Sequence, residues 1–281
     1  MSDGRQRFVA MKQERRPIVM VTAYDCPTAS LEDQADVDVI LVGDSVGTNM
    51  LGYASEAEVT MADMLHHVRA VRRGVQRAYV LGDMPYQSYA TPEDALRNAR
   101  ALLEAGADGV KLEGGEEQLE VVRALRREGI DVCGHVGFTP QTLARPGQKG
   151  RVQGKSFERA IRLLRDAEAL DGAGIMMLVL ELVTEEVAQV ITERVTVPTI
   201  GIGSGRYCDG QVLVVTDLLG LSPFNHRLSR RYAEWRATAI GAFEQYRDDV
   251  QSRRFPAQEN VFPANPEDVA RLRSELATAE S

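Results

Sequence analysis

Side chains able to do acid–base or metal chemistry stand at the ends of short apolar runs in this 281-residue sequence. One polar group in such a place is ordinarily a structural hydrogen-bond partner or a helix cap, because an unpaired charge is costly to bury. Here six successive runs carry such groups, the last of them within Gly201–Gly205, which favours one shared polar site. The other groups belong to Asp44, Ser45, Asp83, Lys111, Glu113, His135 and Glu181.

Three of these residues could bind a metal ion. Asp44, Asp83 and Glu113 offer carboxylate oxygens, which suit Mg²⁺ or a similar hard divalent cation. Zinc fits less well, since His135 is the one histidine in such a position and no cysteine accompanies it at ligand spacing. The alternative is that the acids pair with Lys111 and nearby arginines.

The remaining groups suggest chemistry on a carbonyl compound. Lys111 lies two positions before Glu113 and shares its face of the chain. Its ammonium could neutralise a bound carboxylate or a developing enolate, or its amine could form a Schiff base with a keto group. Partial burial would make Glu181 a useful base, unless it only caps the next helix. His135 is expected either at the substrate or as a satisfied core residue.

Two glycine-containing segments have open interpretations. Gly201–Gly205 (GIGSG) could form a backbone anion cradle or allow close backbone approach. It is not a dinucleotide fingerprint. Val46–Thr60 is long for a loop and could be an active-site lid or plain surface.

Short apolar runs alternate with amphipathic helical patterns, which is typical of a parallel α/β fold. Eight such units favour a (β/α)8 TIM barrel, with its chemistry at the carboxyl ends of the strands; a doubly wound open sheet is the alternative. Helices are expected at 91–105, 156–170 and 184–194. The expected strands are Ile18–Asp25, Val37–Ser45, Ala78–Pro85, Gly109–Gly115, Asp131–Gly137, Ile175–Val183, Pro198–Gly205 and Val212–Leu219.

The sequence predicts one barrel domain at 1–255, with an N-terminal helix and an Arg-rich helical stretch at 229–253. A polar tail at 256–281 is expected to hold a short helix after Pro266.

Composition bears on partners and location. A net charge of −8 and a pI of about 5.2 argue against nucleic acid or an anionic membrane as a partner. The odd number of cysteines, three, argues against a disulfide framework and for a reducing compartment. No apolar run is long enough to span a bilayer, and the polar N-terminus shows no signal core. A cytoplasmic protein is expected.

Long ordered segments resemble one enzyme family over roughly residues 8–255. They are VTAYD (21–25), LVGDSVG (41–47), VTMADMLHHVRAVRRG (59–74), DMPYQSYATPEDALRNA (83–99), GADGVKLEGG (106–115), VCGHVGFTPQ (132–141), RVQGKS (151–156), LVLELV (178–183) and PTIGIGSG with CDGQVLV (198–214). The family is ketopantoate hydroxymethyltransferase.

This resemblance implies a barrel of the phosphoenolpyruvate/pyruvate superfamily, assembled as a homo-oligomer, usually a decamer. It implies Mg²⁺ held by Asp44 and Asp83 with Glu113 close by, and a 2-oxo acid bound by Ser45 and Lys111. Glu181 would be the proton acceptor, with His135 at the substrate.

The implied reaction is a step of pantothenate synthesis. It transfers hydroxymethyl from 5,10-methylenetetrahydrofolate to 3-methyl-2-oxobutanoate, giving 2-dehydropantoate through a Mg²⁺-stabilised enolate.

The sequence departs from the family pattern at Ala144–Gly150, at Arg151, where a lysine is common, and at 51–58. These departures leave the folate contacts and the preferred one-carbon donor open.

Rival interpretations are a lyase or mutase acting through a similar enolate, a hydroxymethyltransferase with another 2-oxo acid, and a non-catalytic binding protein. Retention of Asp44, Asp83, Lys111, Glu113 and Glu181 together argues against the last.

Overall fold

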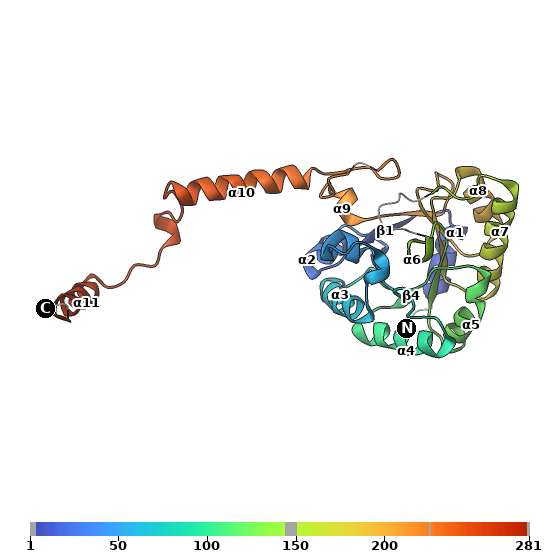
Figure 1. Ribbon diagram of the computed structural model, residues 1–281, viewed down its shortest axis with the longest axis horizontal. Helices are drawn as coiled ribbons and strands as arrows, with labels where there is room; N and C mark the ends of the chain where they lie inside the picture. Colours follow the sequence, from blue (N-terminus) through green and yellow to red (C-terminus); the bar gives the residue numbers. More distant parts are fainter. Residues whose placement is uncertain (1–3, 144–150, 225, 280–281) are drawn as a thin grey trace. The chain divides into compact units, whose positions relative to one another are not determined.

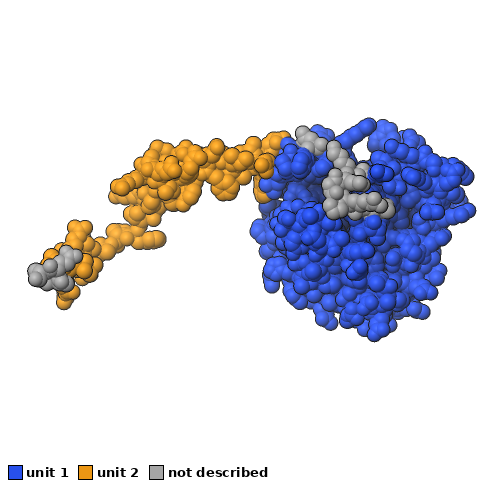
Figure 2. Space-filling view, viewed as in Figure 1, with its two compact units in different colours: residues 1–233 blue, residues 234–281 orange. Residues whose placement is uncertain are grey.

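A computed structural model describes residues 4–143, 151–224 and 226–279 of the chain. The chain divides into two compact units, Met1–Ala233 and Glu234–Ser281, coloured blue and orange in Figure 2. The helix that begins at Trp235 belongs to the second unit. The barrel domain at 1–255 stays a prediction.

The first unit is built around a closed barrel of eight parallel strands, each paired with its neighbours in chain order (Figure 1). Pairing of β1 with β8, from Ile18 opposite Gly210 to Val21 opposite Leu213, closes the ring. The TIM barrel is therefore confirmed and the open sheet is excluded. The strands are β1 Ile18–Thr22, β2 Val39–Val42, β3 Tyr79–Asp83, β4 Gly109–Lys111, β5 Val132–Gly137, β6 Met177–Glu181, β7 Thr199–Ile202 and β8 Gly210–Leu213.

Helices surround this barrel and bury a continuous apolar layer against its outer face. Their starts follow local sequence signals: Thr91 accepts a hydrogen bond from the Asp94 N–H, and Pro92 occupies the first turn of α4. The longer helices are α2 Cys26–Gln34, α3 Met61–Gly74, α4 Pro92–Ala105, α5 Leu119–Arg127, α7 Phe157–Gly172 and α8 Glu185–Arg194.

The N-terminal helix α1, Gly4–Gln13, packs against the barrel interior, where Phe8 and Met11 are fully buried. Its Lys12 ammonium donates to the carbonyl oxygens of Thr192, Val195 and Val197, which precede β7. The helix thus closes the end of the barrel opposite the carboxyl ends of the strands.

The eighth strand was predicted wrongly as Val212–Leu219. The strand is Gly210–Leu213, and Val215–Leu218 forms the short helix α9. A Cβ at Gly210 would lie 2.4 Å from the Ile18 carbonyl oxygen, so the first position of this strand requires glycine. A search for apolar runs does not detect that requirement, because glycine is not part of such a run. The chain then turns where the Val215 N–H donates to the Thr22 hydroxyl.

Between β2 and α3, the long segment 46–60 is ordered into two short turns, a π-helix at Gly47–Leu51 and a 3₁₀ turn at Glu56–Glu58. A second short helix, α6 Pro140–Leu143, follows β5. The departure at Ala144–Gly150 lies outside the described residues.

The second unit contains α10, Trp235–Gln251, a 3₁₀ turn at Gln258–Asn260, and α11, Pro266–Ala279. The expected helix after Pro266 is thus present. None of the described helices is long and apolar enough to cross a membrane.

Candidate active site

The carboxyl ends of β2 to β6 converge on one cavity of about 1250 Å³. All seven side chains predicted from the sequence line it: Asp44, Ser45, Asp83, Lys111, Glu113, His135 and Glu181. Parallel strands place their carboxyl ends at the same end of a barrel, which is why residues up to 137 positions apart meet here.

A buried ion pair lies at the centre of the cavity. The Lys111 Nζ donates to Asp83 Oδ2 at 2.7 Å, and both side chains are almost inaccessible to solvent. Burial acts to lower the pKa of Lys111, but the carboxylates of Asp83, Asp44 and Glu113 outweigh it and raise that pKa above its ordinary value. The other oxygen, Asp83 Oδ1, is buried and has no hydrogen-bond partner among the described residues.

Asp44 lies beside this pair as a second buried carboxylate. Its backbone N–H donates to Asp83 Oδ2 at 3.3 Å, and its Oδ2 accepts a hydrogen bond of 2.7 Å from Gln141 Nε2. Burial, and then the nearby charge of Asp83, raise the pKa of Asp44 well above its usual range. Two buried acids therefore lie near one ammonium, which is paired with Asp83, and a further cation would stabilise their charges.

Glu113, His135 and Glu181 form a second line of contacts across the cavity. His135 Nδ1 lies 3.3 Å from Glu113 Oε1, and His135 Nε2 lies 3.4 Å from Glu181 Oε2. Both contacts are at ion-pair distance without hydrogen-bond alignment. Burial opposes the imidazolium charge, but the two carboxylates outweigh it and raise the pKa of His135 to about 9. The two neighbouring carboxylates thus favour the protonated imidazole.

Asp44, Asp83 and Glu113, the predicted metal ligands, all line the cavity, and their role in binding a metal ion stays a prediction. No three His, Cys, Asp or Glu side chains in the described part of the chain are grouped so that they could hold a metal ion together. Glu113 instead contacts His135 and accepts the Gln141 backbone N–H at 3.1 Å. The structure thus brings Asp44 and Asp83 together and gives Glu113 other partners.

Ser45 lies at the rim of the cavity, and its Oγ is 2.9 Å from the Tyr24 hydroxyl. Tyr24, Gln141 and Tyr89, whose hydroxyl lies 2.5 Å from Gln141 Oε1, were not predicted from the sequence. Tyr24 follows the first apolar run as the other groups follow theirs, so its position could have suggested it. Nothing local distinguishes Gln141 or Tyr89 from surface residues.

The glycine-rich segment after β7 allows close backbone approach. The Ser204 hydroxyl donates to the Leu180 carbonyl at 2.7 Å and accepts the Val183 N–H at 3.0 Å. Gly203 has a left-handed conformation (φ 62°), which its missing side chain permits. The segment therefore fixes the end of β6, from which Glu181 projects.

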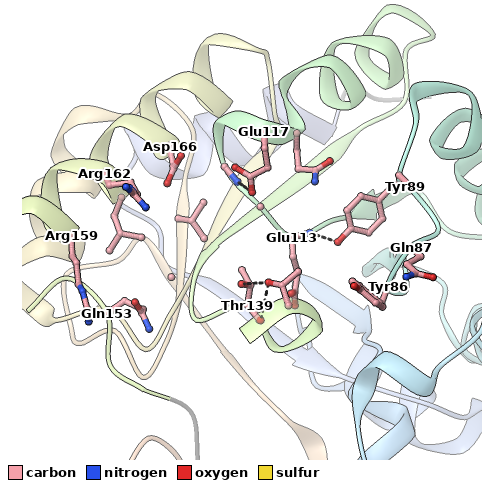
Figure 3. A pocket seen from close by; sticks show the side chains of 18 of the residues that line it. Tyr86, Gln87, Tyr89, Glu113, Glu117, Thr139, Gln153, Arg159, Arg162 and Asp166 are labelled. Carbon is pink, nitrogen blue, oxygen red and sulfur yellow. Dashed lines mark hydrogen bonds between the residues drawn. The ribbon is translucent and has the colours of Figure 1, made fainter. Parts of the chain in front are cut away.

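A second cavity of about 760 Å³ adjoins the first and shares Glu113 with it. Figure 3 shows Arg159, Arg162 and Asp166 of α7 on one side and Tyr86 and Tyr89 on the other. It also shows the hydrogen bond of 3.3 Å from the Glu113 N–H to the Tyr89 hydroxyl.

Structural comparison places the fold among enzymes that share this barrel. Crystal structures of phosphonopyruvate hydrolase with oxalate and Mg²⁺ and of 2,3-dimethylmalate lyase, a PEP mutase/isocitrate lyase superfamily member, give TM-scores of 0.61 and 0.54. Each is 13% identical to the chain and covers at least 97% of both chains. At this identity the likeness shows the fold alone.

Sequence comparison is far more specific. The family model of ketopantoate hydroxymethyltransferase matches residues 5–258. The 3-methyl-2-oxobutanoate hydroxymethyltransferase of Thermotoga neapolitana is 52% identical over 92% of this chain and 95% of its own length. That of Nitrosopumilus maritimus is 44% identical over 97% and 98%. The chain therefore belongs to the ketopantoate hydroxymethyltransferase family, and it is an enzyme of the one-carbon transferase class that these relatives' names describe.

Proposed function

We propose that this enzyme transfers a hydroxymethyl group from 5,10-methylenetetrahydrofolate to 3-methyl-2-oxobutanoate, giving 2-dehydropantoate by way of the enolate of the 2-oxo acid. The observation that carries the proposal is the buried Asp44–Asp83–Lys111 cluster, which faces the more exposed Glu181 across one cavity. The cluster offers charges of both signs to a carboxylate and a keto oxygen, and Glu181 offers a base.

The donor set fits a hard divalent cation such as Mg²⁺. Asp83 Oδ1 is buried without a described hydrogen-bond partner, and the backbone N–H of Asp44 donates to the other oxygen of Asp83, so a second acidic residue adjoins this free oxygen. Mg²⁺ commonly takes one or two protein carboxylates and completes its shell with water and substrate, so Glu113 need only lie nearby. When bound, the ion would polarise the keto and carboxylate oxygens of the substrate as a Lewis acid.

Lys111 is proposed to act as an ammonium rather than as a Schiff-base amine. A Schiff base needs a neutral amine, whereas the raised pKa of Lys111 and its ion pair with Asp83 favour the charged form. The ammonium can stabilise negative charge that develops on the enolate oxygen.

Glu181 is proposed to remove the C3 proton of the 2-oxo acid. Its side chain is 20% exposed, whereas that of Glu113 is 2% exposed. Glu181 is therefore the acid of the His135 pair that a substrate in the cavity can approach. The C3 proton passes to a Glu181 carboxylate oxygen, and the enolate carbon forms the new C–C bond to the one-carbon unit of the folate. Both C–N bonds of the methylene bridge break, water supplies the hydroxyl oxygen, and tetrahydrofolate leaves.

The partners proposed are small molecules, the 2-oxo acid and the folate, with no nucleic acid or membrane. We also propose a homodecamer and a cytoplasmic location. These proposals rest on the family resemblance and on the composition of the chain.

Turnover of 3-methyl-2-oxobutanoate with methylenetetrahydrofolate tests the proposal, measured with and without EDTA and after Mg²⁺ is added back. Turnover lost to EDTA and restored by Mg²⁺ is expected. If EDTA does not change turnover, the proposed role of the metal ion is wrong, and a Schiff base between Lys111 and the keto group becomes the better mechanism. No turnover under any condition would move the function to another 2-oxo acid or donor.

A further inference from the structure

Gln141 is an uncharged, buried residue beside the cavity whose side chain hydrogen-bonds to Asp44, Met84 and Tyr89. It is 4% exposed and comes from α6, a helix of only four residues. Its Nε2 donates to Asp44 Oδ2 at 2.7 Å and to the Met84 carbonyl at 3.0 Å. Its Oε1 accepts from the Tyr89 hydroxyl, and its backbone N–H donates to Glu113 Oε2 at 3.1 Å. One residue thus holds groups at the ends of β2, β3 and β4.

The chemistry of these partners fixes the orientation of the amide. The Met84 carbonyl accepts hydrogen bonds only, and so does the Asp44 carboxylate when it is ionised. Both must therefore face the NH₂ group. The Tyr89 hydroxyl can donate, so it faces the amide oxygen. A reversed amide would place its oxygen against a carboxylate and a carbonyl, which is repulsive.

The backbone N–H of Gln141 holds a second acid of the cavity, Glu113. Gln141 is the second residue of α6, and the first N–H groups of a helix have no partner within it. Here that N–H reaches Glu113 Oε2, while the Glu113 N–H reaches Tyr89, the contact drawn in Figure 3. Asp44 and Glu113 are therefore held to one another through Gln141 and Tyr89.

We propose that Gln141 is a positioning residue that fixes the Asp44 carboxylate for cation binding and ties it to Glu113, with Tyr89 setting the direction of its amide. The inference rests on the proposed cation role of Asp44 and Asp83. Residues that hydrogen-bond to metal-binding carboxylates fix their orientation, and their loss typically lowers metal affinity about 10- to 100-fold.

The test measures Mn²⁺ and Mg²⁺ affinity by isothermal titration calorimetry on the full-length protein without substrate. Gln141→Met keeps the length of the side chain and removes its donors. We expect its dissociation constant to rise about 10- to 100-fold over that of the unmodified protein. Tyr89→Phe removes only the hydroxyl that faces Oε1, and we expect a smaller rise in the same direction.

Thr142→Val is the matched control. Thr142 is the next residue of α6, and its hydroxyl contacts Thr139 rather than any acid of the cavity. Its cation affinity should equal that of the unmodified protein. Thermal denaturation of all three variants accompanies the titrations, and Tyr89→Phe carries the test if Gln141→Met does not fold.

The outcomes separate the inference from the function on which it rests. Failure of the unmodified protein to bind either ion would overturn the proposed cation site and this inference with it. Binding by the unmodified protein, with Gln141→Met or Tyr89→Phe binding equally well, would overturn the role of Gln141 alone. An equal loss in Thr142→Val would show that any disturbance of α6 has this effect and would also overturn that role.

Discussion

At the scale of single residues, most charged side chains of the cavity already contact a side chain of opposite charge. Lys111 is paired with Asp83, and His135 lies between Glu113 and Glu181. Of the four acids, Glu181 has the most solvent-exposed side chain, and its only described ion-pair contact is with His135. A substrate entering the cavity can therefore approach Glu181 more easily than the other three acids, and Glu181 can accept a proton without breaking the Lys111–Asp83 ion pair.

Glu181→Gln should lower turnover by about 10²- to 10⁴-fold, the usual contribution of a positioned general base. The Michaelis constant for the 2-oxo acid should change little, because Glu181 is not part of the Asp44–Asp83–Lys111 cluster. NMR detection of C3 deuterium exchange in D₂O, without folate, isolates the proton-transfer step. Exchange at the unmodified rate in the variant would assign the base elsewhere.

Glu32 is a buried acid that the proposed reaction does not use. Neither of its carboxylate oxygens has a hydrogen-bond partner among the described residues. Burial, followed by the charge of Asp25, raises its pKa from 4.5 to about 8. The folded protein then binds this proton more tightly than the unfolded chain does. The free energy of unfolding should therefore fall as pH rises from about 4.5 to about 8 and level off above that range.

The effect of Glu32 should amount to roughly 3–5 kcal/mol between those limits, since one pKa unit corresponds to about 1.4 kcal/mol. Glu32→Gln should remove that part of the pH dependence and make the protein more stable than the unmodified one at pH 9. Urea denaturation of both proteins at pH 5 and pH 9 measures the difference. Parallel pH profiles for the two proteins would show that Glu32 does not carry it.

At the scale of elements, local pattern predicted most of the barrel because each strand end has a local signal. A polar residue closes an apolar run, and a capping residue such as Thr91 opens the next helix. The positions of Asp44, Asp83 and Glu181 followed from this alternation. The partners of Gln141 could not be predicted, because Asp44 lies 97 residues away and comes near only when the barrel closes. The grouping of Glu113 with His135 rather than with the other acids depends on the same closure.

At the start of β8, contact with the neighbouring strand β1, rather than the local sequence pattern, determines which residue fits. Gly210→Ala would place a methyl group 2.4 Å from the Ile18 carbonyl oxygen and 2.8 Å from Ile18 Cβ, where β8 meets β1. We expect a loss of about 1–3 kcal/mol in the free energy of unfolding, the usual cost of overpacking a core. Gly172→Ala, at the end of α7 with nothing within 4 Å of its added Cβ, is the control. Chemical denaturation should show little loss for the control, and equal effects in both variants would exclude steric closure as the cause.

At the scale of the whole molecule, the two units differ in how far they bury their apolar side chains. The barrel unit buries a core on both faces of its sheet. In the second unit, α10 has no buried residue, although it carries Trp235, Phe243 and Tyr246, which are 45%, 73% and 59% exposed. A helix of this length is marginal in water unless an apolar face is packed, and exposed aromatic clusters commonly mark association surfaces. The proposed homo-oligomer gives these side chains a partner in a second copy of the chain.

Replacing both Phe243 and Tyr246 with serine should therefore reduce the size of the assembly. Sedimentation velocity of the variant should show a shift toward smaller species at concentrations where the unmodified protein stays assembled. Phe262→Ser is the matched control, because Phe262 is 99% exposed but lies outside α10 and α11. An unchanged sedimentation coefficient for the double variant would mean that α10 does not hold the copies together. An equal loss in the control would mean that general surface hydrophobicity, rather than the α10 face, drives association.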